Sequence, residues 1–150
     1  MRVLGIDYGD ARVGLAVSDP TGLLAGGIGT VNITGMNDAV KKIAKIALDN
    51  AVSLIVLGLP VNMDGSKGSS AEKISVFAEK LSLALNNMPY EFIDERRTTI
   101  LAAQFMSETG TFGKKRKDSI DELSAQIILQ TYLDRLKNAD HKGNEQGDNL

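Results

Sequence analysis

The sequence contains no cysteine, and its single histidine, His141, stands close to the C-terminal end. Without cysteine there can be no disulfide bond, no thiolate nucleophile and no zinc or iron-sulfur cluster bound through sulfur. One histidine is too little material for a histidine-based catalytic triad or a histidine-rich metal site. Any chemistry must therefore come from carboxylates, hydroxyls, lysine or arginine.

Long hydrophobic runs are missing as well. No apolar stretch approaches the roughly 18 residues that a membrane span requires. Met1-Arg2 leads directly into a strand-like stretch rather than a secretory signal, so we expect a cytoplasmic protein with no membrane partner. The chain has 150 residues, of which 43% are apolar. This predicts one compact domain and excludes a two-lobed kinase of the actin or sugar-kinase type.

Neither sign of charge dominates, since 17 lysine and arginine residues stand against 19 acidic residues and the net charge is -2. A nucleic-acid partner would therefore need a local basic patch. The only dense basic run covers residues 114–117, and it is interpreted either as a phosphate-binding segment or as a solvated loop. The candidate nucleic-acid contacts are Arg12, Lys67, Arg96, Lys114, Lys115, Arg116 and Lys117.

The order of apolar segments predicts an α/β domain with a mixed five-stranded sheet flanked by helices. Residues 3–6 and 13–17 flank a polar, glycine-containing segment, which is typical of a β-hairpin. The continuous apolar run over 52–59 indicates a central strand buried on both faces. We expect the domain to cover residues 1–137, with a disordered tail over 138–150. Strands are predicted over 3–6, 13–17, 28–31, 52–59 and 90–93, and helices over 37–48, 71–85, 99–106 and 119–137.

Acidic residues follow two of the predicted strands. Asp7 ends the first strand and is followed at once by Gly9, whereas the pair Asp94-Glu95 follows the last strand. Ligands of such sheets gather at the carboxyl ends of the strands, so these acids are candidates for a site. The alternatives are a turn for Asp7 and a salt bridge with a neighbouring arginine for the pair. Spacing does not choose between Asp94 and Glu95.

A third acid, Asp121, lies at the margin of the apolar stripe of the last predicted helix. It could face the sheet, or it could serve the helix start, because Ser119-x-x-Glu122 is a plausible capping box. Three acids on separate elements can converge on one site that binds Mg²⁺ or Mn²⁺ through oxygen alone. Such a site supports phosphodiester cleavage without histidine or cysteine.

Four groups of residues occur in the same order as the motifs of a known family. They are Gly5-Ile6-Asp7-Tyr8-Gly9 with Arg12-Val13-Gly14-Leu15-Ala16-Val17-Ser18-Asp19, then Gly58-Leu59-Pro60 with Met63-Asp64-Gly65-Ser66, then Asp94-Glu95-Arg96 with Thr98-Thr99, and Asp121 with Ile127-Ile128-Leu129-Gln130. Over residues 1 to about 137 the chain thereby resembles the YqgF family. Its members are bacterial RNase H-like proteins, also described as Holliday-junction-resolvase-like proteins and as pre-16S ribosomal RNA nucleases.

The resemblance implies an RNase H-like fold with a metal-dependent acidic site. Matched position by position, the catalytic and metal-binding acids fall on Asp7, Glu95 and Asp121, so the resemblance selects Glu95. Asp7 would bridge the metal ions, and the other two acids would complete their coordination. Whether Asp94 or Asp118 assists the site stays open.

The activity that the resemblance implies is that of an endonuclease using Mg²⁺ or Mn²⁺, acting at the 5′ end of precursor 16S ribosomal RNA. The ribosomal small subunit is a further expected partner. Two other functions stay open. One is a Holliday-junction resolvase acting on branched DNA, which needs two active sites and so favours a homodimer over a monomer. The other is a non-catalytic module that binds RNA or the ribosome.

Overall fold

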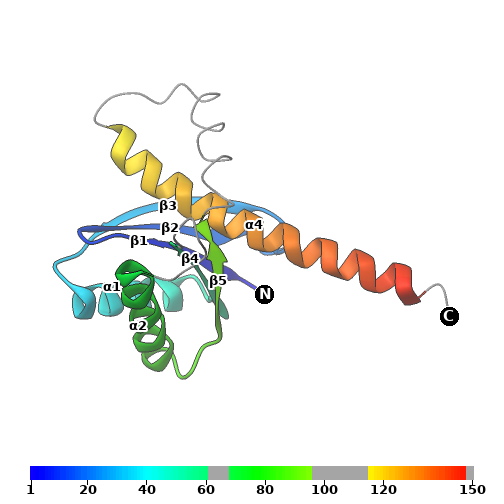
Figure 1. The fold of residues 1–150 in the computed structure, drawn as a ribbon, viewed down its shortest axis with the longest axis horizontal. Helices are drawn as coiled ribbons and strands as arrows, with labels where there is room; N and C mark the ends of the chain where they lie inside the picture. Colours follow the sequence, from blue (N-terminus) through cyan, green and yellow to red (C-terminus); the bar gives the residue numbers. More distant parts are fainter. Residues whose placement is uncertain (61–67, 96–114, 148–150) are drawn as a thin grey trace.

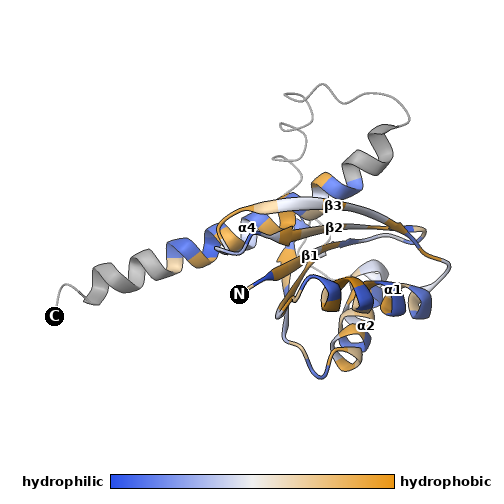
Figure 2. Cartoon of the chain, turned by 180° about the vertical axis from the view of Figure 1, so that it is seen from behind, coloured by the Kyte–Doolittle hydropathy of each residue, from blue (hydrophilic) through white to orange (hydrophobic). Residues whose placement is uncertain are grey.

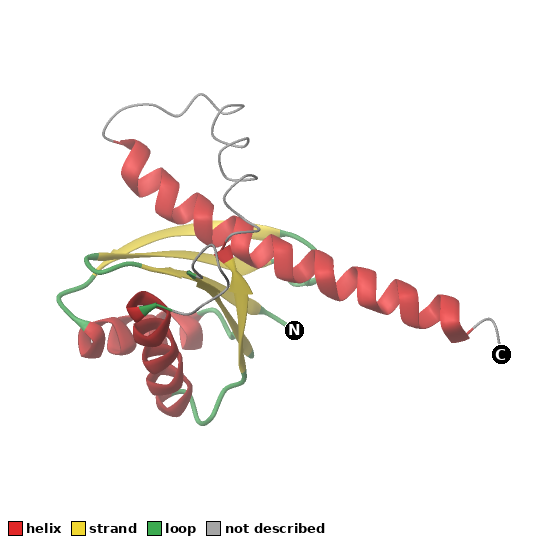
Figure 3. Ribbon diagram, viewed as in Figure 1, coloured by secondary structure: helices red, strands yellow, loops and turns green. Residues whose placement is uncertain are grey.

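The structure, a computed structural model, describes residues 1–60, 68–95 and 115–147. Within the last range, side chains are described for residues 121–139. In this part of the chain, one five-stranded sheet carries helices on both faces (Figures 1 and 3). This arrangement confirms the predicted α/β architecture.

The sheet is mixed, as the sequence predicts. Its strands are β1 (Val3–Tyr8), β2 (Arg12–Ser18), β3 (Ala25–Asn32), β4 (Leu54–Leu59) and β5 (Tyr90–Asp94), in the spatial order β3-β2-β1-β4-β5. The first three strands pair antiparallel, whereas β1, β4 and β5 pair parallel. The carboxyl ends of β1, β4 and β5 therefore meet at one edge of the sheet.

Two helices lie on one face of the sheet and one long helix lies on the other (Figure 1). They are α1 (Met36–Asp49) and α2 (Ser69–Ala84) on the first face, and α4 (Lys115–Gly147) on the second. The helix predicted over 99–106 lies outside the described residues. None of the described helices combines the length and the apolar character needed to cross a membrane.

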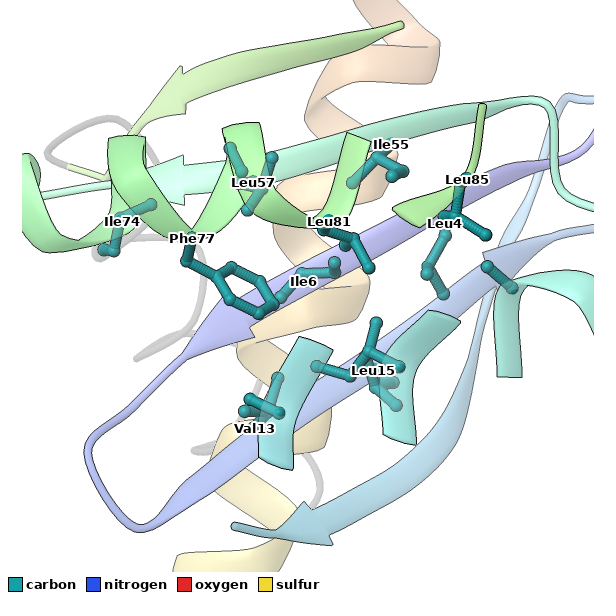
Figure 4. Close-up of a cluster of buried hydrophobic side chains, with 14 of the residues drawn as sticks. Leu4, Ile6, Val13, Leu15, Ile55, Leu57, Ile74, Phe77, Leu81 and Leu85 are labelled. Carbon is teal, nitrogen blue, oxygen red and sulfur yellow. The ribbon is translucent and has the colours of Figure 1, made fainter. Parts of the chain in front are cut away.

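Strand alternation divides the buried residues into two layers. Along β1, Leu4 and Ile6 face α1 and α2, whereas Val3 faces α4. The larger layer, between the sheet and the two shorter helices, includes the fully buried Phe77 of α2 (Figure 4). Figure 2 shows α1 divided between hydrophobic and hydrophilic residues, as expected for a helix with one buried face.

The layer of buried hydrophobic residues beneath α4 is smaller. Its members from the sheet are Val3, Ala16, Leu54, Val56 and Ile93, and its members from the helix are Ala125, Ile128, Leu129, Tyr132 and Leu133. Tyr132 additionally forms a hydrogen bond with Glu91 of β5 through its hydroxyl group. Burial of these residues fixes α4 on the sheet and with it the position of every side chain that α4 presents near the strand ends.

The structure differs from the sequence prediction mainly at β3 and α4. β3 is longer than residues 28–31, because its glycine-rich ends pair with β2 around a bulge opposite Leu15 and Ala16. α4 continues to Gly147, whereas the sequence predicts its end near Lys137 and disorder from residue 138. No proline interrupts this stretch, and adding residues to an existing helix costs little free energy. The domain boundary at residue 137 stays a prediction.

Candidate active site

Asp7 lies at the end of β1 on the face that α4 covers. Ile6 and Tyr8, its neighbours in the strand, face the opposite layer. Gly5, two positions earlier in the strand, lies under α4. A Cβ added to Gly5 would lie 2.9 Å from the carbonyl oxygen of Ala125. Alternation therefore directs the partly buried side chain of Asp7 toward α4.

Glu95 directly follows β5, and its side chain lies across β4. A Cβ at Gly58 of β4 would be 2.7 Å from Glu95 Oε1 and 3.0 Å from Glu95 Cγ. The Glu95 carboxyl group forms a hydrogen bond with Asp7. Spacing left Asp94 and Glu95 open, and the structure brings Glu95 into contact with Asp7.

The contact between Asp7 and Glu95 depends on a shared proton. Burial, followed by the negative charges of Glu95 and Asp121, raises the pKa of Asp7 from 3.8 to about 7. The hydrogen bond between the two groups also raises the pKa of Asp7 and lowers that of Glu95, so the proton belongs on Asp7. Burial is the larger effect on Glu95 and leaves its pKa raised. The pair therefore holds a proton at a pH where a solvated carboxyl group has lost it.

Asp121 approaches this pair from α4. The helix already includes Lys115, so Ser119 is not its N-cap and the capping-box interpretation is wrong. Gly14 of β2 lies directly beneath this turn of the helix, where a Cβ would overlap the carbonyl oxygen of Asp121. The close approach brings the Asp121 carboxylate into electrostatic range of Asp7, whose pKa it raises.

Arg12, the first residue of β2, places a cation beside the acids. Its Nε lies 3.4 Å from Oδ2 of Asp121, and the two side chains are 33% and 27% exposed. Arg12 and Gly14 share the face beneath α4, because they are two positions apart in one strand. The sequence predicts Arg12 as a phosphate contact, whereas in the structure it forms an ion pair with a predicted catalytic acid. Its phosphate contact stays a prediction.

The remaining predicted nucleic-acid contacts are placed only in part. Those that lie outside the described residues are Lys67, Arg96 and Lys114. Residues 115–117 are helical at the start of α4, although the sequence predicts a loop up to Lys117. Their side chains, and that of Asp118, are outside the described ones. Phosphate binding by this basic segment stays a prediction.

The turn between β1 and β2 is held from the face opposite α4. The ring of Tyr8 packs on Phe77 of α2, with 4.4 Å between the ring centroids. Lys73 of α2 forms an ion pair with Asp10 in the turn, with 3.1 Å between Nζ and Oδ1. Because Asp10 is largely exposed, the ring contact contributes more than the ion pair. Together these contacts fix the strand ends from which two site residues extend.

Sequence reasoning did not identify Gly14 and Gly58 as part of the site. Both stand inside strands, where glycine weakens packing and often marks the close approach of another segment. The structure shows what approaches: the backbone of Asp121 over Gly14, and the side chain of Glu95 over Gly58. A glycine inside a predicted strand indicates a close approach, but the sequence does not show which residue approaches.

The donor set fits a hard divalent cation. Asp7 and Glu95 share a proton in their hydrogen bond, and Asp121 adds a further negative charge nearby. A cation can replace that proton, and carboxylate oxygens suit Mg²⁺ or Mn²⁺. Among the described side chains, no three acids, histidines or cysteines are arranged to hold one ion. A metal site formed by all three acids stays a prediction.

Comparison with known families and proteins agrees with the sequence resemblance. A family model named RuvX and described as Holliday junction resolvase matches residues 1–135. A protein of Clostridium novyi (strain NT) named "Putative pre-16S rRNA nuclease" is 44% identical over 136 residues, which cover 91% of this chain and 100% of the relative. A protein with the same name from Caldanaerobacter subterraneus subsp. tengcongensis is 45% identical over 140 residues, covering 93% and 100%.

Solved structures of low sequence identity share the fold. Thermus thermophilus RuvC, solved in complex with a Holliday junction substrate, matches with a TM-score of 0.57 at 13% identity, covering 91% of this chain and 96% of that protein. The fowlpox virus Holliday junction resolvase matches with a TM-score of 0.57 at 12% identity, covering 91% and 99%. These similarities confirm the predicted fold class.

Proposed function

The chain belongs to the RuvX family. From this membership and from the cluster of Asp7, Glu95 and Asp121, we propose that the protein is a metal-dependent endonuclease that processes precursor 16S ribosomal RNA. The observation that carries the proposal is the hydrogen bond between Asp7 and Glu95. Burial and the neighbouring carboxyl group of Glu95 raise the proton affinity of Asp7, which costs stability at neutral pH. A site of this kind is explained by the binding of a cation.

Asp7, Glu95 and Asp121 would hold the cation, which we take to be Mg²⁺ or Mn²⁺, two ions that bind well to oxygen ligands. When bound, such an ion supplies the positive charge that activates water and stabilises a leaving oxygen in phosphodiester hydrolysis. Asp7 must release the proton that it shares with Glu95 before it can act as a ligand. The cation therefore competes with that proton, and acidification should weaken its binding.

Arg12 has two tasks in this proposal. Its Nε orients the carboxylate of Asp121 through the 3.4 Å ion pair. Its guanidinium carries five N–H donors and is partly exposed at the edge of the site, so it also contacts a phosphate of the substrate. We propose that the basic residues 115–117, at the start of α4, provide further phosphate contacts.

The substrate assignment rests on the relatives, which bear the name pre-16S rRNA nuclease and align over nearly all of this chain. We place the activity in the cytoplasm, where ribosomal RNA precursors are processed. The 5′ end of the 16S precursor is the proposed position of cleavage, and the assembling small subunit is the proposed partner.

A second candidate function is cleavage of four-way DNA junctions. It is favoured by the description of the family model and by the fold shared with RuvC and the fowlpox virus resolvase. Paired cuts in opposite strands need two active sites, so this function requires a homodimer. Sedimentation of the protein with and without a junction would measure directly whether it forms a homodimer.

A gel assay tests the proposal. Labelled RNA spanning the small-subunit rRNA 5′ leader and a labelled four-way DNA junction are each incubated with Mg²⁺ or Mn²⁺ and with wild type, Asp7→Asn or Asp49→Asn. Asp49 is an exposed acid at the end of α1, so its variant carries the same chemical change outside the site. RNA cut by wild type and Asp49→Asn but not by Asp7→Asn is the expected result.

Cleavage of RNA by a folded Asp7→Asn protein would overturn the assignment of the site. A cut junction with intact RNA would instead favour the resolvase. If neither substrate is cut while RNA is bound, the chain is a binding module rather than a nuclease.

A further inference from the structure

Glu95 reaches Asp7 by passing over a third strand. In the sheet, β4 lies between β1 and β5. The register pairs Ile6 with Leu57 and Ile93 with Gly58, so Gly58 is the β4 residue that lies between the two acids. The missing side chain of Gly58 leaves room for the Glu95 carboxyl group to cross.

The space above Gly58 is filled from two sides. A Cβ there would be 2.7 Å from Oε1 and 3.0 Å from Cγ of Glu95, and 2.5 Å from Cδ1 of Ile128. Unstrained contacts between such atoms begin near about 3.5 Å. Even the smallest side chain would therefore displace Glu95, Ile128 or both.

Glu95 cannot simply retreat while keeping its contact with Asp7. Its backbone follows directly from the pairing of Leu59 with Asp94, which fixes where the side chain begins. The far end of the side chain is held by the hydrogen bond to Asp7. A group inserted between these two fixed ends must break the hydrogen bond or bend the side chain out of a favoured rotamer.

We propose that Gly58 is a positioning residue: the bare backbone of β4 holds Glu95 in the orientation in which it meets Asp7. This inference rests on the proposed nuclease function and assigns one residue to the geometry of that site. Gly58 differs from Gly5 and Gly14, which face backbone atoms of α4. Like Gly27, which lies opposite the Glu122 side chain, Gly58 faces only side-chain atoms. Of these two glycines, Gly58 is the one that faces a proposed catalytic acid, so an added methyl group there disturbs Glu95 without meeting the backbone of α4.

The first test compares Gly58→Ala with Gly26→Ala. Gly26 is also a strand glycine, but the nearest atom to an added Cβ is the Val17 carbonyl oxygen at 3.9 Å, so the control adds the same methyl group in ordinary contact. Gly58→Ala should lower kcat by roughly 100-fold with KM nearly unchanged. Titration calorimetry on the protein without substrate should show that the affinity for Mn²⁺ is about 10-fold or more weaker.

Second substitutions separate the two contacts. Ile128→Val removes the Cδ1 atom, and Glu95→Asp removes one methylene group from the acid. If Gly58 acts on Glu95, Gly58→Ala combined with Ile128→Val keeps the kcat defect. Glu95→Asp should then cost clearly less kcat in the Gly58→Ala background than in wild type, because the shorter acid no longer meets the added methyl group.

Three results would overturn the inference: wild-type kcat and Mn²⁺ affinity in Gly58→Ala, full recovery on adding Ile128→Val, or equal costs of Glu95→Asp in both backgrounds. If Gly58→Ala does not fold, the Gly58→Ala/Ile128→Val protein is used, and its failure to fold would also overturn it. These outcomes are distinct from failure of the proposed function, which would show as no difference between wild type and Asp7→Asn.

Discussion

Asp7 and Glu95 form a hydrogen bond although the strands that carry them, β1 and β5, are not neighbours in the sheet. The contact passes over Gly58 of the intervening strand β4. Burial, the charges of Glu95 and Asp121, and this hydrogen bond together raise the pKa of Asp7 to about 7. The properties of the site follow from this relationship, and each can be measured.

The stability of the metal-free protein should fall as pH rises toward 7. Because the pKa of Asp7 is raised to about 7 in the folded state, only the unfolded chain loses this proton between about pH 4 and 7. This contribution is therefore favourable at low pH, falls through that window and is constant above it. Asp7→Asn removes the dependence and should raise the free energy of unfolding at pH 8 by about 1–3 kcal/mol.

Urea denaturation in EDTA at pH 5, 6, 7 and 8 measures this effect, with Asp49→Asn as the control. Equal pH dependence in wild type and Asp7→Asn would show that Asp7 is not the group that titrates.

Arg12→Gln should weaken RNA binding uniformly across sequences. If the guanidinium contacts one phosphate, the slope of log affinity against log salt should decrease in magnitude by about 0.7. Loss of the ion pair with Asp121 should also lower stability by up to about 1 kcal/mol, because both partners are partly exposed. Fluorescence anisotropy at several salt concentrations provides the slope. An unchanged slope with reduced stability would show that Arg12 contributes to the folded protein and not to RNA binding.

Replacing the three basic residues 115–117 by glutamine should reduce the salt slope by about 2, which is three single-strand contacts at about 0.7 each. The matched control replaces three exposed lysines on α1 and α2, Lys41, Lys45 and Lys80, and changes the net charge equally. Because these lysines lie on helices of the opposite face, the control should keep the wild-type slope. Equal slopes in both triple variants would mean that the basic segment does not contact RNA.

Gly14→Ala should destabilise the protein and inactivate it together. An added Cβ would overlap the carbonyl oxygen of Asp121, and a helix backbone cannot move aside as a side-chain end can. We expect a loss of about 1–3 kcal/mol, typical of overpacking, with lost cleavage because Asp121 moves with the helix. Thermal unfolding and the gel assay measure both effects. Wild-type stability would show that α4 does not press on β2 as described.

Tyr132→Phe should cost stability but not activity. The buried ring stays, whereas the hydroxyl that donates a hydrogen bond to Glu91 is lost, at a cost of about 1 kcal/mol. The same burial and the same bond raise the pKa of Tyr132 to about 12, so its ultraviolet absorbance should titrate later than that of an exposed tyrosine. A large loss of cleavage in this variant would show that the contact between Tyr132 and Glu91 of β5 is needed for activity.

The sequence predicted the fold well wherever the signal was local. The apolar run over 52–59 gave the fully buried strand β4, although β1 and not β4 is the middle strand of the sheet, and the hairpin between β1 and β2 formed as expected. Local signals failed at the ends of elements. Glycine-rich β3 is held by its pairing with β2, and α4 continues past its contacts with the sheet because no residue stops it.

For the site, the sequence by itself determined the available chemistry. With no cysteine and a single histidine near the C-terminus, the chemistry was left to carboxylates, hydroxyls, lysine or arginine, and the family resemblance of the ordered motifs implied Asp7, Glu95 and Asp121. The ion pair of Arg12, and the close approach of other atoms to Gly14 and Gly58, were decided only by tertiary structure. These relationships join residues that are far apart in the chain, and they exist because strand register and the docking of α4 bring particular atoms together. The spacing of residues along the sequence does not predict such distances.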